Sequence, residues 1–152
     1  MEATDPEMMT IHRILVPFDF SEPSTRALDC AKVMAERFGA TLDVMYVVPN
    51  PYLADPTGVS GPLPPDFLDN LVEDARSGLD KSLPPADRER FKAGTIVKVG
   101  DARSEILAYA QSEHVDLIVM GTHGRGGMAH LVLGSVAERI VRAAPCPVLT
   151  VR

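Results

Sequence analysis

Two runs of residues are apolar at every position, and they restrict the possible folds more than any other feature of the chain. One covers Ile14 to Val16 near the start, and the other covers Leu117 to Met120 near the end. Short apolar runs without alternation are typical of strands that are buried on both faces. Such strands occur in parallel sheets with helices on each side. We therefore expect a sheet with these two runs at its centre.

Strand and helix patterns alternate along the rest of the chain. The predicted strands are Ile11–Val16, Thr41–Val48, Thr95–Val99, Asp116–Met120 and Pro147–Arg152. Helices are predicted between Ser21 and Gly39, through Leu68 to Leu79, from Ala102 to Gln111 and from near Leu133 to Ala144. Strands that alternate with helices form parallel sheets through right-handed crossovers. No internal repeat or second domain is visible.

The strand sequences also indicate which strands lie at the edges. Lys98 interrupts the third strand, and Thr150 and Arg152 alternate with apolar residues in the fifth. Such patterns are typical of edge strands, which are partly exposed. The prediction is a single-domain α/β fold: a doubly wound, Rossmann-like sheet of five parallel strands in the order 3-2-1-4-5, with helices on both faces. Residues 1–10 are expected to be a loose leader, and residues 11–152 the domain.

This strand order predicts where a ligand binds. In doubly wound sheets, ligands bind beyond the carboxyl ends of the strands, at the point where the strand order reverses. Here that point lies between the first and fourth strands. Pro17 and Asp19 follow the first strand, and Met120 and Gly121 end the fourth. These two distant stretches are expected to line one crevice. Asp19 is either a ligand contact or a turn cap, and Met120 is either a wall of the crevice or part of the core.

A glycine-rich stretch, Gly121 to Gly127, follows the fourth strand, and Gly134-Ser135 follows at the start of the last helix. Glycine lets a ligand approach the backbone closely, and free N–H groups at a helix start favour an anion. The stretch is therefore interpreted as a phosphate-binding loop. Ser135 is either a helix cap or a phosphate contact. His123 and Arg125 are either exposed loop residues or phosphate contacts.

Several common phosphate motifs do not fit this stretch. No Gly-Lys-Ser/Thr occurs, which excludes a P-loop. Residues 124–129 match G-x-G-x-x-A, but a dinucleotide fold needs this motif at the first strand and an acidic residue about 20 positions later. The turn after the first strand has no glycine, unlike the phosphate loop of flavodoxins.

The spacing Gly121-x2-Gly124-x9-Gly134-Ser135 does match a known pattern, G-x2-G-x9-G-S/T. At these residues the sequence resembles the universal stress protein family, in its ATP-binding branch. Further resemblance lies in three segments: residues 14–21, 44–48 and 145–149. Four motifs in the right order make the resemblance specific, and it covers about residues 11 to 152.

The resemblance implies an adenine nucleotide in the crevice: ATP, or else AMP or ADP. Residues beside the base and ribose would be Pro17, Asp19, Val47, Met120 and Gly121. Residues at the phosphates would be Gly124, Gly134, Ser135 and Val136. A triphosphate carries more charge than one helix terminus and Arg125 can balance, so Mg²⁺ or Mn²⁺ held mainly by the phosphates and water is expected. The resemblance also implies a homodimer, and the edge strand 147–152 is the expected interface.

Composition limits the other partners. A net charge of −6 argues against nucleic acid, which requires a basic face. Cys30 and Cys146 are too few for a disulfide framework. The N-terminus lacks the apolar core of a signal peptide, and no run reaches membrane-spanning length. The expected location is the cytoplasm.

The expected function is binding, in which the nucleotide changes loop conformation or partner contacts during a stress response. No serine–histidine–acid set or general base is evident. The alternatives are a weak ATP-hydrolysing enzyme and an interaction module that binds no nucleotide. Residues 49–65 contain six prolines and two glycines, and we expect neither helix nor strand there. This segment is either a surface connection or a flap beside the ligand.

Overall fold

The computed structural model describes residues 9–54, 57–58, 61–123 and 133–152. Its strands are β1 (Arg13–Pro17), β2 (Thr41–Val48), β3 (Ala93–Val99), β4 (Leu117–Gly121) and β5 (Val148–Val151). Its helices are α1 (Glu22–Phe38), α2 (Pro51–Ala54), α3 (Phe67–Ser82), α4 (Pro85–Arg90), α5 (Ala102–Ser112) and α6 (Ser135–Ala143). Most of the expected leader, residues 1–8, lies outside the described residues.

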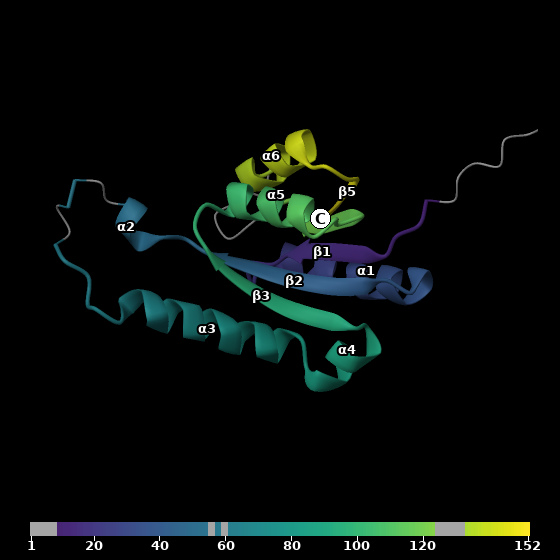
Figure 1. The fold of residues 1–152 in the computed structure, drawn as a ribbon, viewed down its shortest axis with the longest axis horizontal. Helices are drawn as coiled ribbons and strands as arrows, with labels where there is room; N and C mark the ends of the chain where they lie inside the picture. The colour runs from purple at the N-terminus through teal and green to yellow at the C-terminus, as the bar shows by residue number, and fades with distance from the viewer. Residues whose placement is uncertain (1–8, 55–56, 59–60, 124–132) are drawn as a thin grey trace, which may run out of the picture.

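All five strands are parallel, in the order β3-β2-β1-β4-β5 (Figure 1). The predicted order is confirmed. The central strand β1 pairs with β2 from Arg13 opposite Thr41, and with β4 from Ile14 opposite Leu117. The carboxyl ends of β1 and β4 therefore lie at the same edge of the sheet, with the reversal point between them.

Two hydrophobic clusters, one on each face of the sheet, explain why the buried residues of the central strands are all apolar. Ile14 and Val16 belong to the cluster beneath α1 and α3, whereas Leu15 between them belongs to the cluster beneath α5 and α6. Successive side chains of a strand point to opposite faces, so a strand covered on both faces needs apolar residues at every position. Figure 1 shows α5 and α6 on one side of the sheet and α3 on the other.

Helix α1 begins and ends as its sequence predicts. The Ser21 hydroxyl accepts a hydrogen bond from the Ser24 N–H at 3.3 Å, and Pro23 lies in the first turn. Gly39 ends the helix in the left-handed conformation, with φ of 66°. Because β1 leads into α1 through this turn, the cap also fixes the residues that follow the central strand.

Two short helices correct the sequence prediction. We expected no helix in residues 49–65, and the predicted elements include none between Leu79 and Thr95, yet α2 begins at Pro51 and α4 begins at Pro85. Proline is well tolerated in the first turn of a helix, where its missing N–H would have no partner within the helix. The Asn50 side chain also accepts the Tyr52 N–H at 3.0 Å. The third strand begins at Ala93, two residues earlier than predicted, and α6 begins at Ser135.

Two half-buried carboxylates hold the amino ends of the strands. One oxygen of Asp116 accepts the backbone N–H groups of His12 and Arg13, at 2.8 and 2.9 Å. Asp43 accepts the Tyr109 hydroxyl at 3.0 Å. Burial, followed by the negative charge of Asp43, raises the pKa of Tyr109 to about 12. These contacts stabilise the amino ends of the strands, at the end of the sheet opposite the predicted crevice.

Within the described ranges, no helix combines the length and the apolar character needed to cross a membrane.

Candidate functional site

The turn after β1 forms one wall of the predicted crevice. The Phe18 N–H donates to the carbonyl of Met45 at 2.8 Å, which continues the β1–β2 pairing for one residue. The carboxylate of Asp19 then accepts the Ser21 N–H at 3.0 Å. Asp19 is half-buried, and its own N–H donates to the Ser24 hydroxyl at 3.4 Å. The turn-capping role of Asp19 is therefore present, and one carboxylate oxygen takes part in it.

Gly121 forms the opposite wall, and the structure gives a new reason for its lack of a side chain. A Cβ at this position would lie 2.9 Å from the carbonyl carbon and from the Cβ of Pro23, and 3.0 Å from the Ser24 nitrogen. Its φ is not in the left-handed region. The backbone conformation therefore does not require glycine at this position. Gly121 is small because the first turn of α1 packs against the end of β4.

The start of α6 returns to the end of β4. Thr122, the residue after β4, is buried and its N–H donates to the Val151 carbonyl at 2.9 Å. Its own carbonyl accepts the Gly134 N–H at 2.7 Å. Gly134 is the N-cap of α6 and makes no side-chain capping hydrogen bond, and Ser135 beside it is exposed. The structure thus places the N-terminus of α6, which has no side-chain cap among the described residues, beside the carboxyl end of a central strand.

His123 directly follows Thr122 at the carboxyl end of β4. One ring nitrogen, Nδ1, is 3.0 Å from the Thr122 hydroxyl. The other, Nε2, is buried and has no hydrogen-bond partner among the described residues. Of the predicted phosphate residues, Gly124 and Arg125 lie outside the described part of the chain.

Val47 and Met120 are buried in the cluster beneath α5 and α6, at 8% and 5% exposed. Val136, half-buried on α6, packs against the same cluster. The sequence left Met120 either in the core or in the wall of the ligand site. In this structure its side chain is buried in the core, and a ligand contact by Met120 stays a prediction. Pro17 is half-buried at the end of β1, beside Met45 of β2. These side chains would offer a base only an apolar surface.

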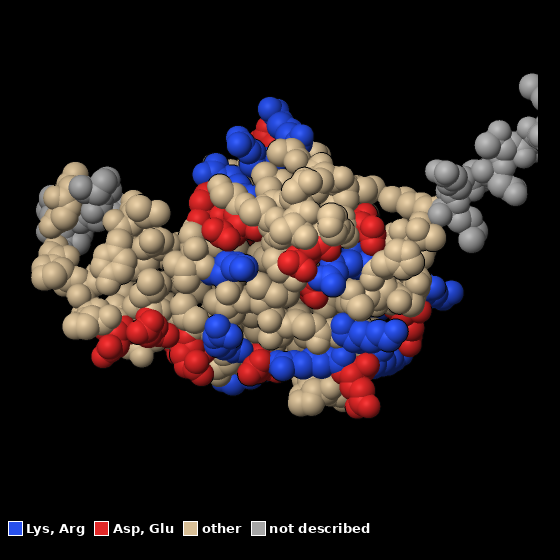
Figure 2. All heavy atoms as spheres, in the orientation of Figure 1, with Lys and Arg blue, Asp and Glu red and all other residues tan. Residues whose placement is uncertain are grey.

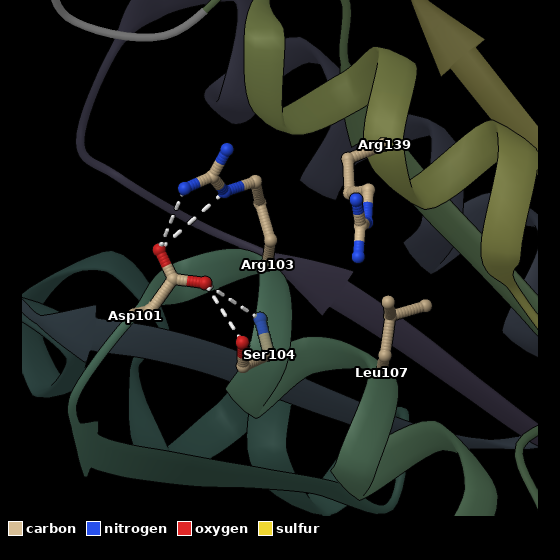
Figure 3. A pocket seen from close by; sticks show the side chains of 5 residues that line it. All are labelled: Asp101, Arg103, Ser104, Leu107 and Arg139. Carbon is tan, nitrogen blue, oxygen red and sulfur yellow. Dashed lines mark hydrogen bonds and ion pairs between the residues drawn. The ribbon is translucent and has the colours of Figure 1, made fainter.

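A partly open pocket lies between α5 and α6 (Figure 3). It has a volume of about 200 Å³, and its lining residues are Asp101, Arg103, Ser104, Leu107 and Arg139. None of them was predicted as a site residue. Asp101 caps α5 by accepting the Ser104 N–H and hydroxyl, at 3.0 and 2.9 Å. These hydrogen bonds are the main reason that the pKa of Asp101 is lowered.

Charge is distributed unevenly around the two helices. Arg103 forms an ion pair with Asp101 at 3.2 Å, whereas Arg139 extends from α6 towards α5 (Figure 3). Figure 2 shows basic side chains gathered over α6, whose arginines Arg139 and Arg142 are exposed. Elsewhere on that face acidic and basic residues are interspersed. The described residues contain no group of three or more His, Cys, Asp or Glu side chains that would hold a metal ion.

The strand order and the elements that meet at its reversal point define an α/β protein of the doubly wound, Rossmann-like class. The chain belongs to the universal stress protein family, whose model matches residues 10–152. Universal stress protein MJ0531 of Methanocaldococcus jannaschii is 36% identical over 141 residues, which cover 92% of this chain and 81% of that protein.

Solved structures agree with this fold. The structure of protein MJ0577, a universal stress protein of Methanocaldococcus jannaschii, matches with a TM-score of 0.76 at 25% identity, over 93% of this chain and 96% of that one. Two more distant structures share the fold. A universal stress protein in complex with cAMP has a TM-score of 0.66 at 22% identity, over 94% of this chain and 98% of its own. One from Archaeoglobus fulgidus in complex with dAMP has a TM-score of 0.62 at 18% identity, over 95% and 100%.

Proposed function

We propose that this protein binds an adenine nucleotide, ATP foremost, at the reversal point of the sheet, and acts as a cytoplasmic binding or switch protein. The observation that carries the proposal is the convergence of three elements there. The Asp19 turn packs through Ser24 against Gly121, and the N-cap residue of α6, Gly134, is hydrogen-bonded to Thr122. The cAMP and dAMP complexes of family members support the choice of ligand.

The residues present suit the parts of such a ligand. The N–H groups at the start of α6 are donors for phosphate, and the helix dipole adds a favourable partial charge. The Asp19 carboxylate is an acceptor for ribose hydroxyls or an adenine amino group. Mg²⁺ or Mn²⁺ would be held mainly by phosphate oxygens and water, because magnesium retains several waters and the described residues offer no acidic cluster.

The proposal is tested by calorimetry and thermal unfolding with Mg-ATP. Mg-ATP at one hundred times its Kd is expected to add about 2.7 kcal/mol to the free energy of unfolding. Gly134→Val is expected to abolish the effect by blocking phosphate approach. The φ of −56° at Gly134 suits any residue, so the backbone itself tolerates valine. The control is Gly94→Val, at a strand position where an added Cβ meets only Asp43, at 3.7 Å.

Each outcome distinguishes the candidate functions. Binding that Gly134→Val removes and Gly94→Val retains supports the nucleotide site. If the purified protein contains no nucleotide and added Mg-ATP neither binds nor raises the Tm, the chain is an interaction module instead. Steady phosphate release above the level of a Gly134→Trp control would make it an ATP-hydrolysing enzyme. Unchanged affinity in Gly134→Val refutes the phosphate assignment.

The proposal includes a homodimer through β5. This strand lies at the edge of the sheet, and Leu149 is 36% exposed there, with Val141 of α6 46% exposed. A short edge strand can pair with its twofold mate and bury both apolar surfaces. Leu149→Lys is expected to yield monomers in analytical ultracentrifugation, and a wild-type chain that sediments as a monomer contradicts this part.

A further inference from the structure

The turn that carries Asp19 continues into Phe20, whose aromatic ring packs against the hydrophobic cluster beneath α1 and α3. The ring of Phe20 packs edge-to-face against Phe18 and Tyr46, with centroid distances of 5.1 Å to each and interplanar angles of 76° and 60°. Edge-to-face contacts at this separation are favourable for aromatic rings. Phe20 therefore has neighbours on two sides within the layer between the sheet and α3.

Helix α3 supplies the third contact. A Cβ at Gly78 would lie 2.7 Å from Cε1 and 2.8 Å from Cζ of the Phe20 ring. The ring therefore fills the space that a side chain at position 78 would need. Gly78 lies in the interior of α3, where glycine is the poorest helix former except proline. This contact gives a structural reason for glycine there.

The backbone of Phe20 is the link to the crevice. Its φ is 65°, in the left-handed region that non-glycine residues rarely adopt. Phe20 lies between Asp19 and Ser21, and the hydrogen bond from the Ser21 N–H to the Asp19 carboxylate spans it at 3.0 Å. If Phe20 left this conformation, that hydrogen bond would be lost and the Asp19 carboxylate would move.

We propose that Phe20 and Gly78 are positioning residues for the nucleotide site: the ring, seated on the bare backbone of α3, holds the strained turn that orients the Asp19 carboxylate. The inference rests on the proposed function, because Asp19 is taken there as a ligand contact. It also couples α3 to the crevice.

The test is a double-mutant cycle of Gly78→Ala and Phe20→Leu. Leucine lacks the two ring atoms that meet the added methyl group. Gly78→Ala is expected to weaken Mg-ATP binding about tenfold, the scale of one hydrogen bond to a charged group. In the Phe20→Leu background it is expected to have almost no further effect. Gly94→Ala, whose methyl group meets no atom closer than 3.7 Å, is the matched control.

A second measurement needs no ligand. Hydrogen exchange of the Ser21 amide reports its bond to Asp19, and it is expected to speed up in Gly78→Ala and in Phe20→Leu but not in Gly94→Ala. If both the exchange rate and the nucleotide affinity are unchanged in Phe20→Leu, the inference is overturned, even if Gly78→Ala fails to fold. If the wild type binds no nucleotide, the proposed function fails, and the exchange rates alone then decide whether Phe20 orients the turn.

Discussion

Substitution of Gly121 by alanine tests the tight contact between the end of β4 and the first turn of α1. The added Cβ would lie 2.9 Å from two atoms of Pro23 and 3.0 Å from the Ser24 nitrogen. Two of these three atoms are backbone, so no side-chain rotation relieves the contact. Either α1 or β4 must shift by several tenths of an ångström. Overpacking of this kind costs about 1–3 kcal/mol.

That cost corresponds to a decrease in Tm of about 2–4 °C for each kcal/mol in a chain of this size. Calorimetric unfolding of Gly121→Ala, without ligand, measures it. The matched control is Gly94→Ala, which is expected to leave Tm unchanged or to raise it slightly, since alanine reduces the freedom of the unfolded chain. Equal Tm values for the two variants would contradict the close approach as the reason for glycine at position 121.

Three further outcomes are expected. Asp101→Ala should lower the free energy of unfolding by about 1 kcal/mol through loss of the α5 cap. Hydrogen bonds from Ser104 lower the pKa of Asp101 in the folded chain, so the extra stability of the wild type is present above the ordinary aspartate pKa and is lost as the pH falls through the lowered pKa. Asp116→Ala should cost about 1–3 kcal/mol in urea unfolding, because two backbone N–H groups at the start of β1 lose their acceptor. Burial, followed by the charge of Asp116, raises the pKa of Cys146, so in a Cys30→Ser background its alkylation at neutral pH should be slower in the folded chain than in urea. Equal rates in the two states would refute that reasoning.

The sheet was predictable because its signals are local. The run Leu117 to Met120 is apolar at every position, which indicates a strand covered on both faces. Lys98 indicates that the third strand lies at an edge. The helices that begin at Pro51 and Pro85 were missed because proline was treated only as a breaker. At the first position of a helix the same residue is favoured, and sequence alone did not show which role applied.

The site was less predictable because its geometry depends on contacts between distant segments. The sequence placed Asp19 and Gly121 at one crevice, and the packing of α1 on β4 joins them. The reason for glycine at position 121 lies about 100 residues away in the chain, in Pro23, so no local pattern reveals it. The contact between the Phe20 ring and Gly78 likewise joins two segments that lie far apart in the chain. Ligand contacts by these residues remain predictions.

The position of β1 has a consequence for how the chain is made. β1 pairs with β2 only about 30 residues later, but its other neighbour, β4, begins at Leu117. A chain synthesised from its N-terminus therefore exposes the second edge of this central strand until most of the domain has been translated. Unpaired apolar edges are sites of intermolecular pairing. Protection of the nascent edge of β1 against aggregation thus depends on residues of β4, which the ribosome adds about 100 residues after β1.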